Sequence, residues 1–197
     1  AANFATLFAE AERATEYRSA ADDIVAAMCD HLYSQELGRF LRGLVVNDQG
    51  SLIADPTVDA SLFAIFAFGC FDPEDERVVN TMTAVEEKLT NRTPTGGVAR
   101  FENDGYMRES DGIIGNSWYI CSLWLADYYI ASSHSREDLD KALKTIHWVM
   151  ESALPSGVLA EQIDPVTGKH KSVSPLTWSH STFVSTVHKY LDKLKSL

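Results

Sequence analysis

Residues 117–132 read SWYICSLWLADYYIAS, and this stretch decides the fold. Aromatic and aliphatic side chains fall on nearly every face of a helix built from it, which is typical of a helix that is buried on all sides. No apolar run in the chain reaches the ~20 residues that a membrane-spanning helix needs. Other parts of the protein must therefore bury this helix.

Five further helices are predicted, and they belong to two alternating kinds. Residues 58–68 and 177–194 are expected to form inner helices, the first of them apolar nearly all round. Residues 11–33, 73–89 and 136–153 carry apolar residues on one face at helical spacing, as outer helices do. Asp72 and Ser135 are the expected N-caps of the last two. The predicted apolar faces are Tyr17, Ala21, Ile24, Val25, Met28 and Leu32, then Val78, Met82, Val85 and Leu89, then Leu139, Leu143, Ile146 and Met150.

The connections alternate in the same way. Short links follow the apolar helices, whereas long loops at 34–57, 90–116 and 154–176 lead into them. Loops of this length are uncommon in a compact domain and are usually functional. The apolar helices begin near 58, 117 and 177, a weak internal repeat. These features predict one all-α domain over residues 1–197, a partial α/α toroid whose three helix pairs form about half of a six-pair ring. The alternative is an irregular helical bundle.

The charge of the chain excludes some classes of partner. Seventeen Lys and Arg residues stand against 28 Asp and Glu residues, so the formal net charge is −11. Nucleic acids and anionic membranes are bound through a positive field, so we expect neither as a partner. No spacing of His, Asp and Glu indicates a metal site, and we expect no cofactor.

The cysteines and the start of the chain give two further expectations. Cys29, Cys70 and Cys121 lie far apart in apolar stretches. This pattern predicts buried free thiols in a reducing compartment, and hence a cytoplasmic location. The chain begins at Ala1 without an initiator Met or a signal-peptide pattern. We interpret that start as a processing site or as the beginning of a fragment.

Candidate catalytic residues lie in the second and third long loops. The second loop contains GGVARFENDGY at 96–106, and the third contains SGVLAEQIDP at 156–165. Glu161 follows three apolar residues, so its carboxylate is expected at the wall of a pocket. A carboxylate in such surroundings is a candidate general acid or base. A solvated loop carboxylate is the alternative.

Several of these motifs together resemble the glucoamylase-type glycoside hydrolases, family fifteen. SGVLAEQ at 156–162, the Pro-x-x-Gly turn at 165–168 and LTWSH at 176–180 resemble the C-terminal signature of that family. Asp59-Ala60-Ser61, Arg100-Phe101 and Gly115-Asn116-Ser117-Trp118 match it at the right intervals. The resemblance covers about residues 55–190. The family typically has Pro at the position of Ser117, where a Ser can cap the helix instead.

The resemblance implies an α/α toroid and inverting hydrolysis of α-linked glucosides. It makes Glu161 the general base, which takes a proton from the water that attacks the anomeric carbon. It implies that Arg100 and Asp104 bind hydroxyls of the terminal sugar, and that Trp118 and Trp178 offer it apolar faces. The other implied substrate-binding residues are Asn116 and Gln162, which lies beside Glu161.

These residues also have structural alternatives. Trp118 could belong to the core, and Arg100 could be a surface residue paired with Glu102. Asn116 could be a cap, and Tyr106 a loop aromatic. His180 is expected to be a packed helix residue rather than a catalytic group.

One departure from the family pattern is serious. The general acid of the family is the Glu of a Trp-Glu pair in the first half of its toroid. In this chain the four tryptophans are followed by Tyr119, Leu125, Val149 and Ser179. Loss of a general acid lowers a rate on the order of 10²–10⁴-fold. We therefore predict that the chain is the C-terminal half of a catalytic domain, that a missing N-terminal half supplies the acid, and that the chain alone has negligible glucosidase activity.

A half ring of this kind would expose the apolar side chains that its other half covers. Exposed apolar surface favours self-association, so a dimer or higher oligomer is expected. The sequence leaves the α-glucan or α-glucoside substrate open among starch ends, dextran, glucodextrin and trehalose. The alternative function is that of a non-catalytic helical module that binds carbohydrate or a protein.

Overall fold

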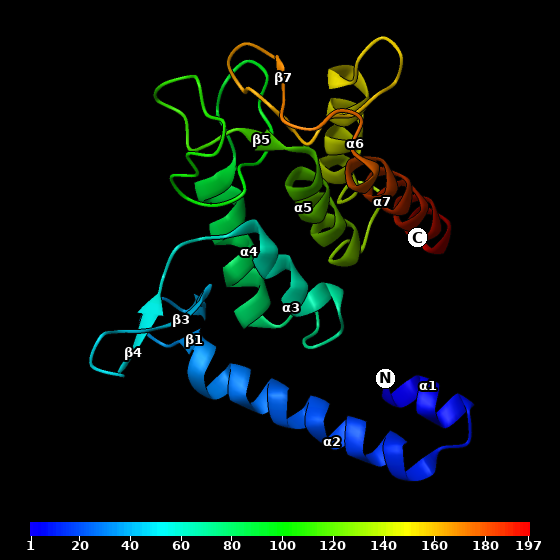
Figure 1. Ribbon diagram of the computed structural model, residues 1–197. Coiled ribbons are helices and arrows are strands. Elements are labelled where there is room, and N and C mark those ends of the chain that lie inside the picture. The colour runs from blue at the N-terminus through cyan, green and yellow to red at the C-terminus, as the bar shows by residue number, and fades with distance from the viewer. The chain divides into compact units, whose positions relative to one another are not determined.

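Helix α5 (Tyr119–Ala131) is the central helix of the fold. A computed structural model describes residues 1–197 (Figure 1). Most side chains of α5 are buried, and the helix packs on α6 (Asp140–Ser152) and α7 (Thr177–Ser196). The predicted buried helix is confirmed, although it begins two residues late because Ser117–Trp118 forms strand β5.

The chain divides into two compact units, Ala1–Asp55 and Pro56–Leu197. In the first unit, α1 (Ala2–Leu7) packs on α2 (Ala11–Ala27), and a π-helical turn follows at Met28–Leu32. Two hairpins then pair β1 (Tyr33–Ser34) with β2 (Arg39–Phe40) and β3 (Gly43–Val46) with β4 (Leu52–Asp55). The segment predicted as the first long loop is thus largely two antiparallel hairpins.

Helix α2 has an apolar face that is not buried. None of its residues is buried, and Ile24 is 61% exposed. Within its unit the helix packs on the short helix α1 and on the π-helical turn, so most of its predicted apolar face is uncovered.

The second unit begins with two short helical pieces. A 3-10 turn, η2 (Ala60–Phe63), runs into α3 (Ala64–Ala67). Leu62, Ile65 and Phe66 are buried, but Phe68 is 77% exposed. The prediction of burial on all sides was therefore wrong for this segment, because the rest of the unit covers only one side of it.

The outer helices of the second unit follow their predicted stripes with one shift. In α4 (Glu76–Leu89) the four predicted apolar positions are all buried. In α6 the buried face contains Val149, while Met150 is 59% exposed, so the predicted face was wrong by one position at that end. α7, which was predicted as an inner helix, buries only Ser179 and Thr186, so the prediction of a buried inner helix was wrong there.

Both predicted N-caps lie in turns before their helices. Asp75, not Asp72, caps α4, and its carboxylate accepts from the Arg77 amide at 2.9 Å. Ser135 accepts from the Asp138 amide at 3.2 Å, one turn before α6 begins. The side chains close turns as such residues do, but the helices start later than predicted.

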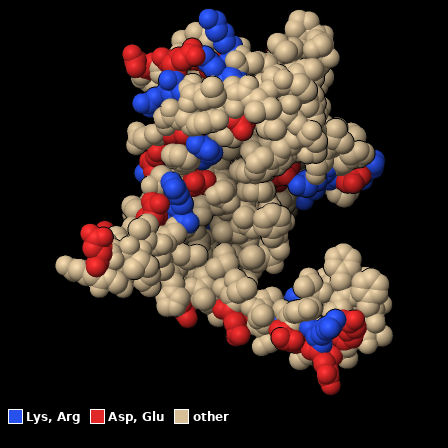
Figure 2. Space-filling view, in the orientation of Figure 1, with Lys and Arg blue, Asp and Glu red and all other residues tan.

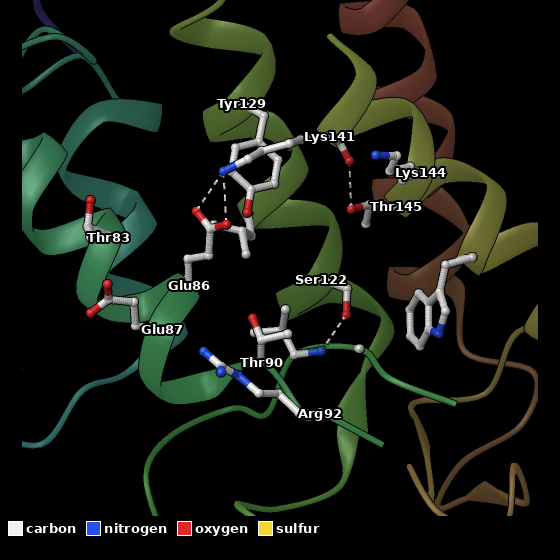
Figure 3. A pocket seen from close by; sticks show the side chains of 14 residues that line it. Thr83, Glu86, Glu87, Thr90, Arg92, Ser122, Tyr129, Lys141, Lys144 and Thr145 are labelled. Atoms are coloured by element: carbon white, nitrogen blue, oxygen red, sulfur yellow. Dashed lines mark hydrogen bonds and ion pairs between the residues drawn. The ribbon is translucent and has the colours of Figure 1, made fainter. Parts of the chain in front are cut away.

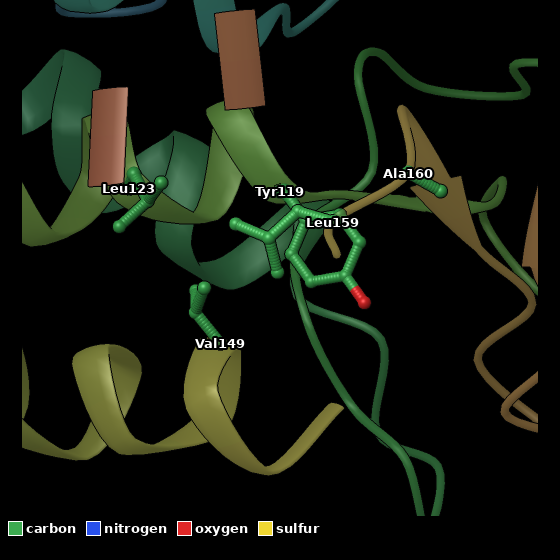
Figure 4. Packing of buried hydrophobic residues seen from close by; sticks show 5 residues of the cluster. All are labelled: Tyr119, Leu123, Val149, Leu159 and Ala160. Carbon is green, nitrogen blue, oxygen red and sulfur yellow. The ribbon is translucent and has the colours of Figure 1, made fainter. Parts of the chain in front are cut away.

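A small sheet joins the two long loops of the second unit. β5 pairs with β6 (Gln162–Ile163), which pairs with β7 (His170–Lys171). Below it, Tyr119, Leu123, Val149, Leu159 and Ala160 form a buried cluster (Figure 4). Both loops therefore meet at the end of the unit where α5 begins (Figure 1).

At the coarse level the helical class is confirmed, since helices make up about half of the chain. The short strand pairs were not predicted, and the single domain and the partial toroid stay predictions. None of the cysteines forms a disulfide, and of the three only Cys121 is fully buried. No helix is both long and apolar enough to cross a membrane. On the face drawn in Figure 2, Lys and Arg side chains are interspersed with Asp and Glu.

Candidate active site

Arg100 and Asp104 form a two-pronged ion pair in the second long loop. Arg100 Nε donates to Asp104 Oδ2 and its Nη2 donates to Oδ1, both at 2.9 Å. The Asp104 side chain is 2% exposed and that of Arg100 is 35% exposed. The bonds fix the planar guanidinium and leave part of it open to solvent, where it can still donate. The alternative pairing with Glu102 is not observed, because the Glu102 carboxylate accepts from the Val58 amide at 2.8 Å.

Three aromatic rings surround the Arg100 guanidinium. Its central carbon lies 4.6 Å from the ring centre of Trp118, 4.8 Å from that of Phe101 and 5.5 Å from that of Tyr106. Trp118 is only 5% exposed, whereas Tyr106 is 48% exposed. A guanidinium is stabilised when it lies over the face of an aromatic ring, because the ring face carries partial negative charge. Trp118 thus supports Arg100 from within the protein, and Tyr106 lies at the open edge.

Glu161, Gln162 and Asn116 form a hydrogen-bonded row. Gln162 Nε2 donates to Glu161 Oε2 at 3.0 Å, and Asn116 Nδ2 donates to Gln162 Oε1 at 2.9 Å. Asn116 and Gln162 are buried, and Glu161 is half-buried. We call these three residues the amide side of the site, and Arg100 with Asp104 the charged side.

Strand β5 brings the two sides together. Trp118 lies opposite Gln162 in the β5–β6 pair, so the residue behind Arg100 neighbours the amide side. Gly115 allows the approach of the charged side, because a Cβ at that position would lie 2.9 Å from the Cβ of Asp104. Six of the seven predicted site residues therefore gather around one strand.

Trp178, the seventh, makes a different set of contacts. It lies in the first turn of α7, is 52% exposed and meets Trp124 edge-on at 5.8 Å between ring centres. The next residue, Ser179, donates to the Ala160 carbonyl at 2.7 Å. The start of α7 is thereby tied to the residue before Glu161. His180 accepts from the Leu159 amide at 3.0 Å, in keeping with its expected packed role.

Three residues support β5, and of these only Ser117 had been assigned a role from the sequence. Buried Asn91 donates to the Gly115 carbonyl and to the Ser117 hydroxyl, both at 2.9 Å. Ser117 in turn donates to the Gly96 carbonyl at 2.6 Å, so its expected role as a helix cap was wrong. Gly97 has a φ of +88°, and a Cβ there would lie 2.6 Å from Ser117 and from Trp148. The double glycine at 96–97 was the available signal.

Asp164 connects the same two loops farther out. Its carboxylate accepts from Ser110 at 2.8 Å and from the amides of Val166 and Thr167. Burial alone would raise the pKa of Asp164, but the hydrogen bonds from Thr167, Ser110 and Val166 lower it below its ordinary value. The group therefore acts as an anchored carboxylate.

The buried thiol of this unit is not a candidate catalytic group. Burial raises the pKa of the Cys121 thiol well above its ordinary value, so the thiol stays protonated and unreactive. No group of three or more His, Cys, Asp and Glu side chains is placed to hold a metal ion.

A groove of the second unit lies apart from the predicted site residues. It measures about 620 Å³ between α4, α5 and α6 and is drawn in Figure 3. Lys141 crosses it, donating to Glu86 at 2.9 Å and covering the Tyr129 ring at 4.9 Å. The Trp148 indole nitrogen is bound to the Thr95 carbonyl. These groups already have partners, and none of the predicted site residues lines the groove.

Comparison with known proteins identifies the family. The model of glycosyl hydrolases family 15 matches residues 1–188. The chain belongs to this family. A glycosyl hydrolase of Methanocaldococcus jannaschii is 31% identical over 145 residues, which are 68% of this chain and 22% of the relative. The trehalase of Mycobacterium tuberculosis is 27% identical over 180 residues, 90% of this chain and 24% of the relative. The glucoamylase of a Clostridium species is 27% identical over 161 residues, which are 75% of this chain and 22% of the relative.

Solved structures share the fold of this family 15 chain. A bacterial glucoamylase complexed with acarbose superposes with a TM-score of 0.79 at 22% identity, over 98% of this chain and 31% of that one. The glucoamylase from Saccharomycopsis fibuligera superposes with a TM-score of 0.67 at 12% identity, over 98% of this chain and 52% of that one. The chain spans no more than about a quarter of the length of the three curated relatives named above.

Proposed function

We propose that this chain carries the general base and part of the sugar-binding site of an inverting glycoside hydrolase that removes terminal α-linked glucose. Glu161 takes a proton from the water that attacks the anomeric carbon, on the face opposite the departing sugar. Arg100 and Asp104 bind hydroxyls of the terminal glucose, and Trp178 offers its open ring face. Trp118 acts from behind, as the support of Arg100.

The observation that carries this proposal is the contact of Glu161 with Gln162. The amide donates to one carboxylate oxygen, Oε2, at 3.0 Å, and Oε1 makes no hydrogen bond to the protein. A carboxylate held at one oxygen presents the other to a water in a fixed direction, which a general base requires. Curated relatives named trehalase and glucoamylase supply the class of substrate, α-linked glucose, which we carry to this chain as part of the proposal.

The general acid is proposed to come from a further part of the hydrolase. The sequence has no Trp-Glu pair, and the chain spans only part of its relatives. In an inverting enzyme the two carboxyl groups stand about 6.5–9.5 Å apart with the water between them. We propose that the partial α/α toroid of this chain is completed by the part that holds the acid.

An uncovered aromatic row in the second unit supports such a companion. Ring contacts run from Phe68 to Phe63 at 6.0 Å, on to Trp124 at 4.2 Å and then to Trp178 at 5.8 Å. Phe68 is 77% exposed and Trp178 52%. Exposed apolar patches of this kind mark interaction surfaces. We propose that the companion part packs on the Phe68–Phe63 end of this row, which leaves the ring face of Trp178 to the sugar, and that without the companion two copies of the chain associate through that end.

A substrate with an activated leaving group tests the base without the acid. Fluoride departs from α-D-glucosyl fluoride with little need of protonation, whereas maltose requires an acid for its leaving oxygen. The chain is expected to release β-glucose slowly from the fluoride and none from maltose, followed by NMR of the anomeric proton. Glu161→Gln is expected to lower the fluoride reaction by on the order of 10²–10⁴-fold.

The matched control is Glu87→Gln, which removes an exposed carboxylate on α4. It should leave the rate unchanged. Equal rates for the wild-type chain and Glu161→Gln, or release of α-glucose, would contradict the proposed role of Glu161.

A further inference from the structure

Asn116 is closed to direct contact with a sugar. Its side chain is 1% exposed. Its Nδ2 lies 2.9 Å from Gln162 Oε1, 3.0 Å from the Met107 carbonyl and 3.3 Å from the Tyr106 carbonyl. An amide NH₂ has two protons, so these acceptors use all of its donor capacity. Its Oδ1 is buried and has no hydrogen-bond partner. Any role in the site must therefore be indirect.

The orientation of the Asn116 amide is fixed by its main-chain neighbours. Two of the three acceptors around Nδ2 are peptide carbonyls, which cannot donate. An Asn116 side chain turned by 180° would place Oδ1 against both carbonyls. The nitrogen must therefore face them, and it then also faces Gln162.

The same logic passes to Gln162, which is 0% exposed. Because Asn116 can only donate at this point, the neighbouring atom of Gln162 must be its oxygen. The nitrogen of Gln162 is then turned to Glu161 Oε2 at 3.0 Å. A Gln162 amide turned over would set a nitrogen against a nitrogen at one end and an oxygen against a carboxylate oxygen at the other. Only one amide orientation satisfies both contacts.

We infer that Asn116 is a positioning residue that sets the orientation of the Gln162 amide and thereby holds the Glu161 carboxylate with Oε1 free. The role of Glu161 as a base rests on the proposed function, whereas the orientation of the two amides follows from their contacts alone. The same nitrogen binds the carbonyls of Tyr106 and Met107. Asn116 thus links the loop at the open edge of the sugar site to the proposed base.

The backbone of Gln162 is held independently of Asn116. Gln162 pairs with Trp118 on one side and with Lys171 on the other in the three-stranded sheet. Loss of the Asn116 amide is therefore expected to free the Gln162 side chain while the strand stays in place. This separation makes the inference testable by a measurement on the side chain alone.

Hydrogen exchange of the Gln162 side-chain amide is that measurement. The chain has three glutamines, and Gln35 and Gln49 are exposed in the first unit, so they serve as internal references. With ¹⁵N-glutamine labelling, the Gln162 signal is assigned by its loss in Gln162→Glu. In the wild-type chain its protons are expected to exchange much more slowly than those of the two references.

Asn116→Ala is expected to speed exchange of the Gln162 amide by about tenfold, the factor that corresponds to one hydrogen bond. Thr186→Ala is the matched control, since Thr186 is 0% exposed and its hydroxyl donates to Asp127 on α5, with no hydrogen bond to β5 or to Gln162. It should leave that exchange unchanged. Unchanged exchange in Asn116→Ala, or equal acceleration in both variants, would overturn the inference.

A second variant covers the case in which Asn116→Ala does not fold. Asn116→Ser keeps a polar group but is too short to bridge to Gln162, so faster exchange is expected again, and unchanged exchange overturns the inference.

The glucosyl fluoride assay separates the two proposals. Faster exchange together with a lower kcat and an unchanged KM supports both. Faster exchange in a chain that never hydrolyses the fluoride supports the positioning and contradicts the proposed function.

Discussion

Arg100 and Asp104 are four residues apart and share two charged hydrogen bonds, whereas Asn116 and Gln162 are 46 residues apart and share one neutral bond. The charged side is thus built within a single loop. The amide side exists only after β5 and β6 have paired. The difference predicts that the charged side is strong and local, and that the amide side depends on the sheet beneath it.

Removal of the buried carboxylate is expected to have the largest effect on stability. Asp104→Ala leaves Arg100 without its partner among three aromatic rings. Breaking a buried pair costs about 3–5 kcal/mol. Because the Arg100 side chain is 35% exposed, we expect about 2–3 kcal/mol, measured by urea unfolding.

The matched control for that pair is Glu86→Ala on α4. Glu86 pairs with Lys141 at 2.9 Å with both side chains exposed, so a loss below about 1 kcal/mol is expected. Equal losses in the two variants would show that the burial of Asp104 adds nothing, and the contrast between the two sides would fail.

Gly97→Ala tests the shared support of both sides. The added Cβ would lie 2.6 Å from the Ser117 Cβ and from a Trp148 ring carbon, at a φ of +88°. Overpacking and backbone strain of this kind cost about 1–3 kcal/mol. Because β5 carries Trp118 and pairs with Gln162, the change should also speed exchange of the Gln162 amide.

Gly50→Ala is the control for backbone strain without crowding. Gly50 has a φ of +76° and nothing within 4 Å of an added Cβ. Its expected loss is smaller than that of Gly97→Ala, about 1 kcal/mol. If Gly97→Ala left the Gln162 amide unaffected, the amide side would not depend on the sheet as the comparison requires.

The buried face of a helix was predictable from the sequence where another element packs against its apolar side. In α4 the predicted face, Val78 to Leu89, is the buried face, because the helix packs against α5 and η2. In α2 the same kind of pattern stays exposed, as at Ile24. Periodicity shows which face of a helix can be buried, but whether it is buried depends on what packs against it.

The site was predictable to a similar extent. The motifs marked Glu161 and Arg100 because they resemble the signature of the family, and Glu161 also because it follows three apolar residues. The partner of Arg100 was ambiguous, since Glu102 and Asp104 are both near it in sequence, and only burial selects Asp104. Asn116 was expected to touch substrate. Its contacts with Gln162 depend on strand pairing across 46 residues, which no local pattern encodes.

The smallest expected effect concerns the outer tie between the two loops and depends on pH. Ser110→Ala removes one hydrogen bond to the Asp164 carboxylate, a loss of about 1 kcal/mol at pH 7. The folded-state pKa of Asp164 lies below its ordinary value, so its contribution to stability is present above that ordinary value and is lost as pH falls through the folded pKa. The difference between Ser110→Ala and the wild-type chain should therefore shrink as urea unfolding is repeated from pH 7 toward pH 3. Thr145→Ala, whose hydroxyl donates to the Lys141 carbonyl on α6, is the control without a carboxylate. A difference that stayed constant with pH in Ser110→Ala would show that the charge of the Asp164 carboxylate adds nothing to this tie beyond a neutral hydrogen bond.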